Sequence, residues 1–154
     1  MEKVINDDSL SSDGIIITPL NNLPKTIRVT AAIIEKEGKI LIAKRKAGDD
    51  LFAGLWEFPG GKIEEGETPE ECIARELKEE LDIEVKVGKL ISSNKHKYPH
   101  GIFDLLAYRI KHISGAMILN DHDEIKWVTV DEMSNFEFPP ADIPIITYLG
   151  NANI

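Results

Sequence analysis

Cysteine and positive charge are both scarce in this sequence. A single cysteine, Cys72, among 154 residues excludes an intrachain disulfide framework. The chain has 18 Lys and Arg against 27 Asp and Glu, a formal net charge of −9. This balance disfavours binding to a nucleic-acid polymer, because that binding depends on basic side chains that neutralise phosphates. A single nucleotide needs far fewer basic side chains and is therefore the better partner.

Long apolar runs are missing as well. No segment reaches the roughly 20 apolar residues that cross a membrane, and the N-terminus lacks the basic-then-apolar pattern of a secretory signal. We therefore expect a cytoplasmic protein with no membrane partner. The length and the 42 % hydrophobic content are sufficient for one domain with a single core.

We expect a polar N-terminal extension over residues 1–25 and one folded domain over residues 26–154. Within the extension, the segment from Gly14 to Thr18 reads Gly-Ile-Ile-Ile-Thr. Such a β-branched run is typical of an edge strand or an adhesive segment, and we assign it no function.

Short apolar segments predict strands interspersed with helices. Residues 28–34 and 39–43 are rich in apolar and β-branched side chains, and Gly38 between them indicates a hairpin turn within residues 35–38. Further elements are expected as strands at residues 86–92, 103–110 and 125–130 and as a helix after Asp142. This order favours the α/β class, with a mixed sheet between helices.

The stretch from Gly61 to Ile83 is the most informative part of the sequence. It reads Gly61, five residues, Glu67, seven residues, Arg75-Glu76-Leu77, one residue, Glu79-Glu80, one residue and Ile83. Within it a helix is expected to begin after Thr68, which can cap it, and to end near Leu81. Pro69 is tolerated in the first turn, and Glu71 completes a capping box.

This helix carries an apolar stripe and an acidic stripe about a quarter-turn apart. The apolar stripe consists of Ile73, Leu77 and Leu81, and the acidic stripe of Glu76, Glu79 and Glu80. Carboxylates at spacings of three and four residues repel one another, so the acidic stripe predicts a bound cation. Ligands that are all oxygen suit Mg²⁺ or Mn²⁺, which also bind substrate phosphates.

Two further features complete the predicted metal site. The paired glycines Gly60 and Gly61 allow the backbone to approach a metal or phosphate closely, so the Gly60 carbonyl is a candidate ligand. Arg75 lies on the acidic helix and can form a bidentate pair with Glu67. We interpret this pair as structural rather than chemical.

The stretch resembles the Nudix box, and the residues Trp56 to Lys62, which read WEFPGGK, resemble the MutT-type nucleoside triphosphate pyrophosphohydrolases. The resemblance extends from Ile27 to Leu149 and implies an α/β/α sandwich. It also implies a metal bound by Glu76, Glu79, Glu80 and the Gly60 carbonyl. In this arrangement Glu80 is the innermost ligand.

Asp82 departs from the Nudix box, which has Gly at this position. The position ends the helix, where Gly relieves the strain of a left-handed backbone. Asp tolerates that conformation better than most residues do. We therefore expect a small cost in stability and an intact site.

The reaction implied by the resemblance is attack of water on a nucleoside triphosphate, giving a nucleoside monophosphate and pyrophosphate. It requires a metal that neutralises phosphate charge, a carboxylate that orients or deprotonates the water, and a basic side chain on the phosphates. Arg45 occupies the place where similar proteins have a phosphate-contacting Arg. The alternative is an ordinary solvated basic turn.

The carboxylate that assists the water is predicted from a late strand. MutT-like proteins have a carboxylate six residues before a Trp, and here Asp121 precedes Trp127 by that distance. Asp121 is therefore the first candidate, with Glu124 and Glu79 as alternatives, although an acidic loop that is merely solvated has the same composition. We expect His122 to be a surface residue rather than a ligand.

Base recognition is predicted for the segment from Phe138 to Pro144, which reads FPPADIP. It resembles the segment of MutT-type enzymes that places an amide against an oxidised guanine, with Asp142 in place of Asn. An ionised Asp only accepts hydrogen bonds, so it favours exocyclic amino groups or the extra N–H of an oxidised purine. Asp142 is equally suited to cap a helix. Tyr98, Phe58 and Lys62 are further candidate substrate contacts, although aromatic residues more often belong to a core.

The resemblance thus implies Mg²⁺-dependent hydrolysis of nucleoside triphosphates that sanitises modified nucleotides such as 8-oxo-dGTP. A preference for CTP or dCTP is an alternative, because relatives that favour these nucleotides share the sequence PADIP. ADP-ribose and dinucleotide polyphosphates rank lower, since the segment indicates a single base pocket. A non-catalytic nucleotide-binding module is an alternative of another class, but no metal carboxylate is lost here. We expect a monomer or a homodimer.

Overall fold

The computed structural model describes residues 25–48 and 52–152. The strands are β1 (Thr26–Lys36), β2 (Lys39–Arg45), β3 (Trp56–Glu57), β4 (Glu84–Tyr98), β5 (Gly101–Ser114) and β6 (His122–Val128). The helices are α1 (Pro69–Leu81), α2 (Ile143–Ala152) and the short 3₁₀ helices η2 (Asp131–Asn135) and η3 (Pro140–Asp142). The candidate strand at residues 14–18 lies outside the described residues.

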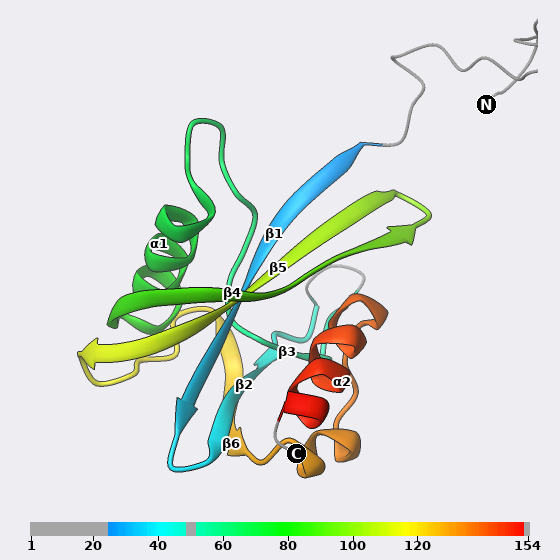
Figure 1. Cartoon of the computed structure of the whole chain (residues 1–154). Helices are drawn as coiled ribbons and strands as arrows, with labels where there is room; N and C mark the ends of the chain where they lie inside the picture. Colours follow the sequence, from blue (N-terminus) through cyan, green and yellow to red (C-terminus); the bar gives the residue numbers. More distant parts are fainter. Residues whose placement is uncertain (1–24, 49–51, 153–154) are drawn as a thin grey trace, which may run out of the picture.

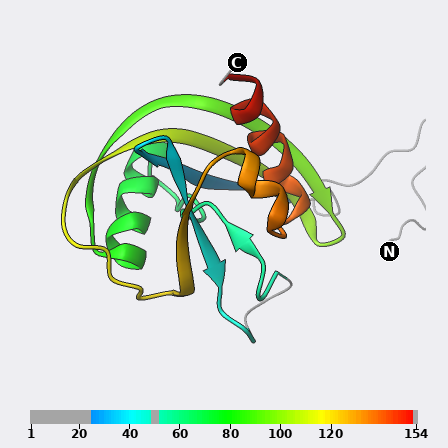
Figure 2. The same ribbon diagram turned by 90° about the horizontal axis from the view of Figure 1, so that it is seen from below.

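The strands form a mixed sheet, as predicted. Over the described residues the strand order is β3-β2-β1-β5-β4, with β6 paired to β2. The β1–β5 pair is parallel, whereas the pairs that involve β2 and the β4–β5 pair are antiparallel. Strands β4 and β5 form a long hairpin that curves across one side of the molecule (Figure 2).

An apolar core lies on each face of the sheet. Successive residues of β1 point to opposite faces, so Ala31 and Ile33 belong to one core and Ala32 and Ile34 to the other. The helical residues in these cores are Ile145 and Leu149 of α2 on the first face and Ile73, Leu77 and Leu81 of α1 on the second. The two helices therefore lie on opposite sides of the strands (Figures 1 and 2), which confirms the predicted α/β/α sandwich.

A tight turn joins β1 to β2, as predicted. Glu37 and Gly38 have φ values of 53° and 78°, and Lys36 pairs directly with Lys39. Two left-handed residues between paired positions are typical of a two-residue β-hairpin turn. The described β1–β2 ladder covers only the residues next to this turn, which leaves the rest of that edge of β1 open to another segment.

The segment that contains the paired glycines bonds to this open edge of β1. Ala32 donates its N–H to the Pro59 carbonyl at 2.7 Å, and Thr30 donates its N–H to the Gly61 carbonyl at 2.8 Å. Gly60 has a φ of 153°, and a side chain at this position would collide with the Thr30 carbonyl. The sheet therefore fixes the glycine backbone that the metal prediction requires.

The predicted elements are present, with altered ends. The helix from Pro69 to Leu81 is confirmed, and β4 and β5 extend well beyond their predicted ranges. Strand β6 begins at His122 and ends at Val128, two residues short of the predicted end. Strand β3 and helix η2 are too short to produce a periodic pattern in the sequence. None of the described helices has both the length and the hydrophobicity to span a membrane.

Candidate active site

Local signals fix both ends of α1. Glu71 donates its N–H to the Thr68 hydroxyl at 3.0 Å, and Thr68 donates its N–H to the Glu71 carboxylate at 2.9 Å, which completes the predicted capping box. At the other end Asp82 has φ 57° and ψ 39°. The left-handed conformation expected at the departure from the Nudix box is therefore present, and Asp82 also pairs with Lys78 at 2.9 Å.

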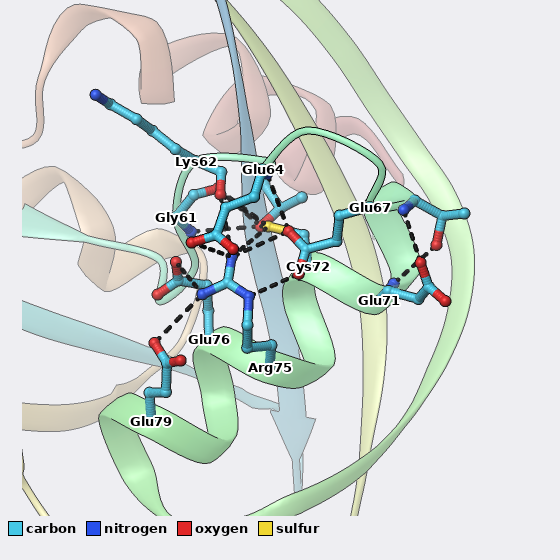
Figure 3. A network of polar contacts seen from close by, with 11 residues as sticks. Gly61, Lys62, Glu64, Glu67, Glu71, Cys72, Arg75, Glu76 and Glu79 are labelled. Carbon is cyan, nitrogen blue, oxygen red and sulfur yellow. Dashed lines mark hydrogen bonds and ion pairs between the residues drawn. The ribbon is translucent and has the colours of Figure 1, made fainter.

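Arg75 joins α1 to the loop before it (Figure 3). Its Nε donates to Glu67 Oε2 at 2.6 Å and its second terminal nitrogen to Glu67 Oε1 at 3.0 Å, so the predicted bidentate pair forms. The same nitrogen donates to the Lys62 carbonyl at 3.3 Å. The hydrogen bonds from Arg75 lower the pKa of the Glu67 carboxyl to about 2. These contacts fasten the loop that follows the paired glycines to the acidic helix.

The three glutamates of the acidic stripe have different environments. Arg75 also pairs with Glu76 at 3.1 Å and with Glu79 at 3.3 Å (Figure 3). The Glu79 side chain is 60 % exposed, whereas Glu80 is buried and only 6 % exposed. Burial raises the pKa of the Glu80 carboxyl well above its ordinary value, and the charges of Glu57 and Glu76 act in the same direction. Burial also raises the pKa of the Glu76 carboxyl.

The loop before β6 closes the end of α1 and carries Asp121. Ile118 donates its N–H to the Leu81 carbonyl at 2.9 Å, and Asn120 donates its N–H to the Glu80 carbonyl at 3.1 Å. The Asn120 side-chain amide donates to the Glu79 carbonyl at 3.0 Å. These bonds satisfy carbonyls that the helix end leaves unpaired, and they place Asp121 where its charge acts on Glu80.

The candidate water-assisting residues differ in position. Asp121 is exposed, and its charge contributes to the raised pKa of Glu80. Glu124 pairs instead with Lys126 at 3.2 Å, with both side chains nearly half exposed. Glu79 is held by Arg75. Of the three predicted candidates, Asp121 thus has the clearest electrostatic link to the buried glutamate.

A pocket of about 260 Å³ opens beside the glycine backbone. Its lining combines aromatic rings with charged side chains from β2, β3, η3 and the segment after Gly61. All five predicted substrate contacts line it, namely Arg45, Phe58, Lys62, Tyr98 and Asp142. Gly60 and Gly61 lie in the same lining, so the predicted nucleotide contacts adjoin the predicted carbonyl ligand.

Strand β4 holds the segment that contains Asp142. Ala141 donates its N–H to the Tyr98 hydroxyl oxygen at 3.0 Å, and the Asn94 amide donates to the Ala141 carbonyl at 3.2 Å. Both backbone groups of Ala141 are therefore fixed by side chains of one strand. Asp142 is 8 % exposed, and burial raises the pKa of its carboxyl well above the ordinary value, with the Glu57 charge adding to the effect and Arg45 opposing it.

The aromatic candidates belong to the core and to the pocket wall at once. Phe58 is 4 % exposed and packs on Phe138 with ring centroids 5.5 Å apart. Tyr98 is 7 % exposed and packs on Phe52 and Phe103, with centroids 5.2 and 5.3 Å away. Stacking of a base on either ring remains a prediction.

Comparison with known proteins settles the family. Residues 24–149 match the NUDIX domain family. The chain belongs to this family. A CTP pyrophosphohydrolase of Escherichia coli (strain K12) is 41 % identical over 122 residues, which are 79 % of this chain and 90 % of that protein. An 8-oxo-dGTP diphosphatase of Haemophilus influenzae is 37 % identical over 128 residues, or 82 % of this chain and 93 % of that protein.

A solved structure supports the same assignment. The solution structure of the E. coli ORF135 protein has a TM-score of 0.77 and 38 % sequence identity, and the match covers 88 % of this chain and 96 % of that chain. The mixed sheet between helices is therefore the Nudix fold, and the protein is a Nudix hydrolase.

Nudix hydrolases generally use divalent metal ions, and the residues present fit such an ion. Glu80 Oε1 is buried and has no hydrogen-bond partner among the residues described, which is costly without a cation. Glu76 lies so close to Gly61 that a side chain there would collide with its carboxyl group. Among the described residues no group of three or more side chains is already arranged to hold a metal, and Glu79 pairs with Arg75.

One prediction in this Nudix hydrolase is wrong. His122 is not a surface residue: it is 5 % exposed, and its Nε2 lies 2.8 Å from Glu57 Oε2. Arg45, for which a solvated basic turn was the alternative, lies in the pocket with NH1 2.9 Å from Glu57 Oε1.

Glu57 is the functional candidate that the sequence interpretation missed. It lines the pocket, and its charge raises the pKa values of both Glu80 and Asp142. The sequence signal that could have identified Glu57 is the alternation of side chains along a strand. Trp56 and Phe58 are core residues, so a carboxylate between them points to the other face.

Proposed function

We propose that this Nudix hydrolase cleaves nucleoside triphosphates to a nucleoside monophosphate and pyrophosphate, with Mg²⁺ or Mn²⁺ as cofactor. One observation carries the proposal. A single pocket brings together every residue predicted to contact the nucleotide, and it adjoins Gly60, whose carbonyl is the predicted backbone ligand.

The metal would be held by carboxylates of α1 and by the glycine backbone. Glu80, Glu76 and the Gly60 carbonyl would be its ligands, and Glu79, which pairs with Arg75, would be a further ligand. When bound, the ion neutralises phosphate charge and polarises the phosphoryl group. Arg75 and Glu67 have a structural role, because their bidentate pair holds the preceding loop on the helix.

The remaining steps belong to the protein's own side chains. Asp121 orients the attacking water and accepts its proton. The water oxygen forms a new bond to phosphorus, the P–O bond between the α- and β-phosphates breaks, and its electron pair leaves on the departing phosphate oxygen. Arg45 and Lys62 bring positive charge to the pocket for the phosphates.

Replacement of Asp121 by Asn tests the role of this residue in the reaction. We expect a turnover number lowered more than about tenfold, because general-base assistance contributes at least that much. Glu124→Gln is the matched control, since Glu124 pairs with an exposed lysine. Full activity in the Asp121→Asn variant would remove Asp121 from the mechanism.

The pocket favours bases that present N–H groups. The Glu57 and Asp142 carboxyl groups both line it, and a carboxyl group offers at least one hydrogen-bond acceptor whether it is ionised or protonated. Oxidised guanine offers an added N–H and cytosine offers its amino group, so 8-oxo-dGTP and CTP are the two leading substrates. The names of the relatives, 8-oxo-dGTP diphosphatase and CTP pyrophosphohydrolase, support both, and hydrolysis of the first would sanitise the nucleotide pool.

Hydrolysis of a panel of nucleotides, with all phosphate-containing products separated by chromatography, tests the proposal. The panel contains 8-oxo-dGTP, dGTP, CTP, dCTP, ADP-ribose and a diadenosine polyphosphate, each with Mg²⁺ and with EDTA. We expect metal-dependent release of pyrophosphate, which is fastest from 8-oxo-dGTP or from a cytosine nucleotide. Faster cleavage of ADP-ribose or of the dinucleotide would overturn the substrate class, and binding without cleavage would indicate a nucleotide-binding module.

A further inference from the structure

The Glu57 carboxylate is held from two sides. Arg45 NH1 donates to its Oε1 at 2.9 Å, and His122 Nε2 donates to its Oε2 at 2.8 Å. An ionised carboxylate can accept about four hydrogen bonds, so each oxygen retains capacity for a ligand. Because Glu57 lines the pocket, this remaining capacity is available to a bound nucleotide.

A β-bulge brings His122 to this place. The register between β2 and β6 shifts after Lys44, so that Arg45 pairs with His122 and Asp123 is passed over. Residues directly opposite in a sheet share a face. In a regular ladder Asp123 would stand opposite Arg45, and its negative charge would repel Glu57. The bulge thus exchanges a carboxylate for a hydrogen-bond donor, as bulges beside active sites often re-aim a side chain.

The His122 ring is in an environment that fixes its orientation. Its side chain is 2 % exposed, and Nδ1 has no partner within residues 25–48 and 52–152. A proton on Nδ1 would therefore be an unpaired buried donor, which is costly. The tautomer with its proton on Nε2 avoids this cost and gives Glu57 its hydrogen bond.

We propose that His122 is a positioning residue for base recognition, holding Glu57 as the acceptor of an N–H group on the base. This inference rests on the proposed function. His122 directly follows Asp121, so the contact with Glu57 also links the water-assisting loop to the pocket. In this arrangement the carboxyl groups of Glu57 and Asp142 both face the base. Glu57 is fixed in place by its hydrogen bonds with Arg45 and His122.

Nucleotide pairs that differ at one hydrogen-bonding position test the inference. CTP carries an amino group where UTP has a carbonyl, and 8-oxo-dGTP carries an N–H where dGTP has a bare nitrogen. The wild-type protein is expected to prefer the first member of at least one pair, measured as the ratio of kcat/KM values with Mg²⁺. His122→Leu is expected to lower that ratio about tenfold, the usual worth of a hydrogen bond to a charged group.

Two variants separate positioning from simple loss of structure. His122→Gln restores an N–H donor near the position of Nε2, so it is expected to recover most of the selectivity. In a Glu57→Gln background, His122→Leu is expected to change the ratio less than about twofold, because the acceptor that His122 positions is already altered. Spectra of ¹⁵N-labelled histidine provide a readout without substrate, with the proton of His122 expected on Nε2.

The outcomes are distinct. An unchanged ratio in His122→Leu, or an equal fall in kcat/KM for both members of a pair, would overturn the inference while leaving the proposed function intact. A proton on Nδ1, or no recovery in His122→Gln, would also overturn it. If the wild-type protein hydrolysed no nucleoside triphosphate, the proposed function would fail first and the inference with it.

Discussion

Helix α1 and the nucleotide pocket are assembled in different ways. The acidic residues of α1, their capping groups and Arg75 lie within one short stretch of sequence and are placed by helical geometry. The pocket takes its lining from β1, β2, β3, β4, β5 and η3, so tertiary structure alone brings its residues together. The comparison teaches that the carboxylates of the proposed metal site are locally encoded, whereas the lining of the proposed base pocket depends on the whole fold.

Replacement of Glu80 should distinguish the role of α1 from that of the pocket most clearly, because it should lower activity without changing the preference among nucleotides. Glu80→Gln removes the buried carboxylate of the predicted metal site, and we expect kcat/KM to fall roughly 10²- to 10³-fold on every nucleotide hydrolysed. The ratios between nucleotides should stay within a factor of about two, because the pocket is untouched. Steady-state kinetics on the nucleotide panel measure both quantities.

The exposed Glu70, in the first turn of the same helix, provides the matched control. Glu70→Gln should leave activity unchanged. A Glu80→Gln variant that retained activity, or one that lost it for a single base only, would contradict the division between the two regions.

Replacement of Asp142 should have the opposite effect to replacement of Glu80, changing the preference among bases rather than the overall activity. Asp142→Leu removes a polar group from the pocket wall, and we expect the preference among bases to change by about tenfold while Mg²⁺ affinity stays constant. Asp142→Asn keeps the shape and adds a donor, so it should shift the preference rather than remove it. Kinetics on the panel and calorimetric titration with Mg²⁺ test this pair, and a loss of metal binding in either variant would break the comparison.

The pH dependence of the free energy of unfolding should reveal the ionisation of the buried Asp142 carboxyl group. Burial raises the pKa of Asp142 in the folded protein. A carboxyl of this kind stabilises the fold fully below its unfolded pKa, and that stabilisation is lost as the pH rises through the folded pKa. As the pH rises above about 4, the free energy of unfolding should therefore decline less steeply in Asp142→Asn than in the wild-type protein. Urea unfolding without metal measures the slopes, and identical slopes would show that Asp142 ionises normally.

The smallest effect is expected at the departure from the Nudix box. Asp82→Gly relieves a left-handed residue but removes its ion pair with Lys78. We expect the free energy of unfolding to rise by less than about 1 kcal/mol and activity to stay the same. Urea unfolding and the pyrophosphate assay check both, and a large change in activity would show that this helix end participates in catalysis.

The sequence predicts the first region well for a physical reason. The capping box at Thr68, the end of the helix at Asp82 and the Arg75–Glu67 pair are all short-range features, and each has a local signal. The family resemblance supplied most of the pocket residues, and the structure brings Arg45 and Asp142 into one pocket with three other predicted contacts.

The features that the sequence did not predict depend on long-range geometry. His122 became a buried partner of Glu57 through a register shift between β2 and β6, and no local pattern reveals a bulge. Strand β3, which carries Glu57, is two residues long and leaves no periodicity. His122 and Glu57, the two residues whose roles were not predicted, both lie where the pocket meets the acidic residues of α1. The sequence is therefore least informative at the junction of these two regions.

Paramagnetic broadening by Mn²⁺ tests the metal site on α1 most directly. Substoichiometric Mn²⁺ added to ¹⁵N-labelled protein should broaden the amide signals of Gly60, Gly61, Glu76 and Glu80 first. Added Mg²⁺ should restore the signals by competition. Broadening centred on any other part of the molecule, or none at all with nucleotide present, would contradict a metal-dependent reaction at this helix.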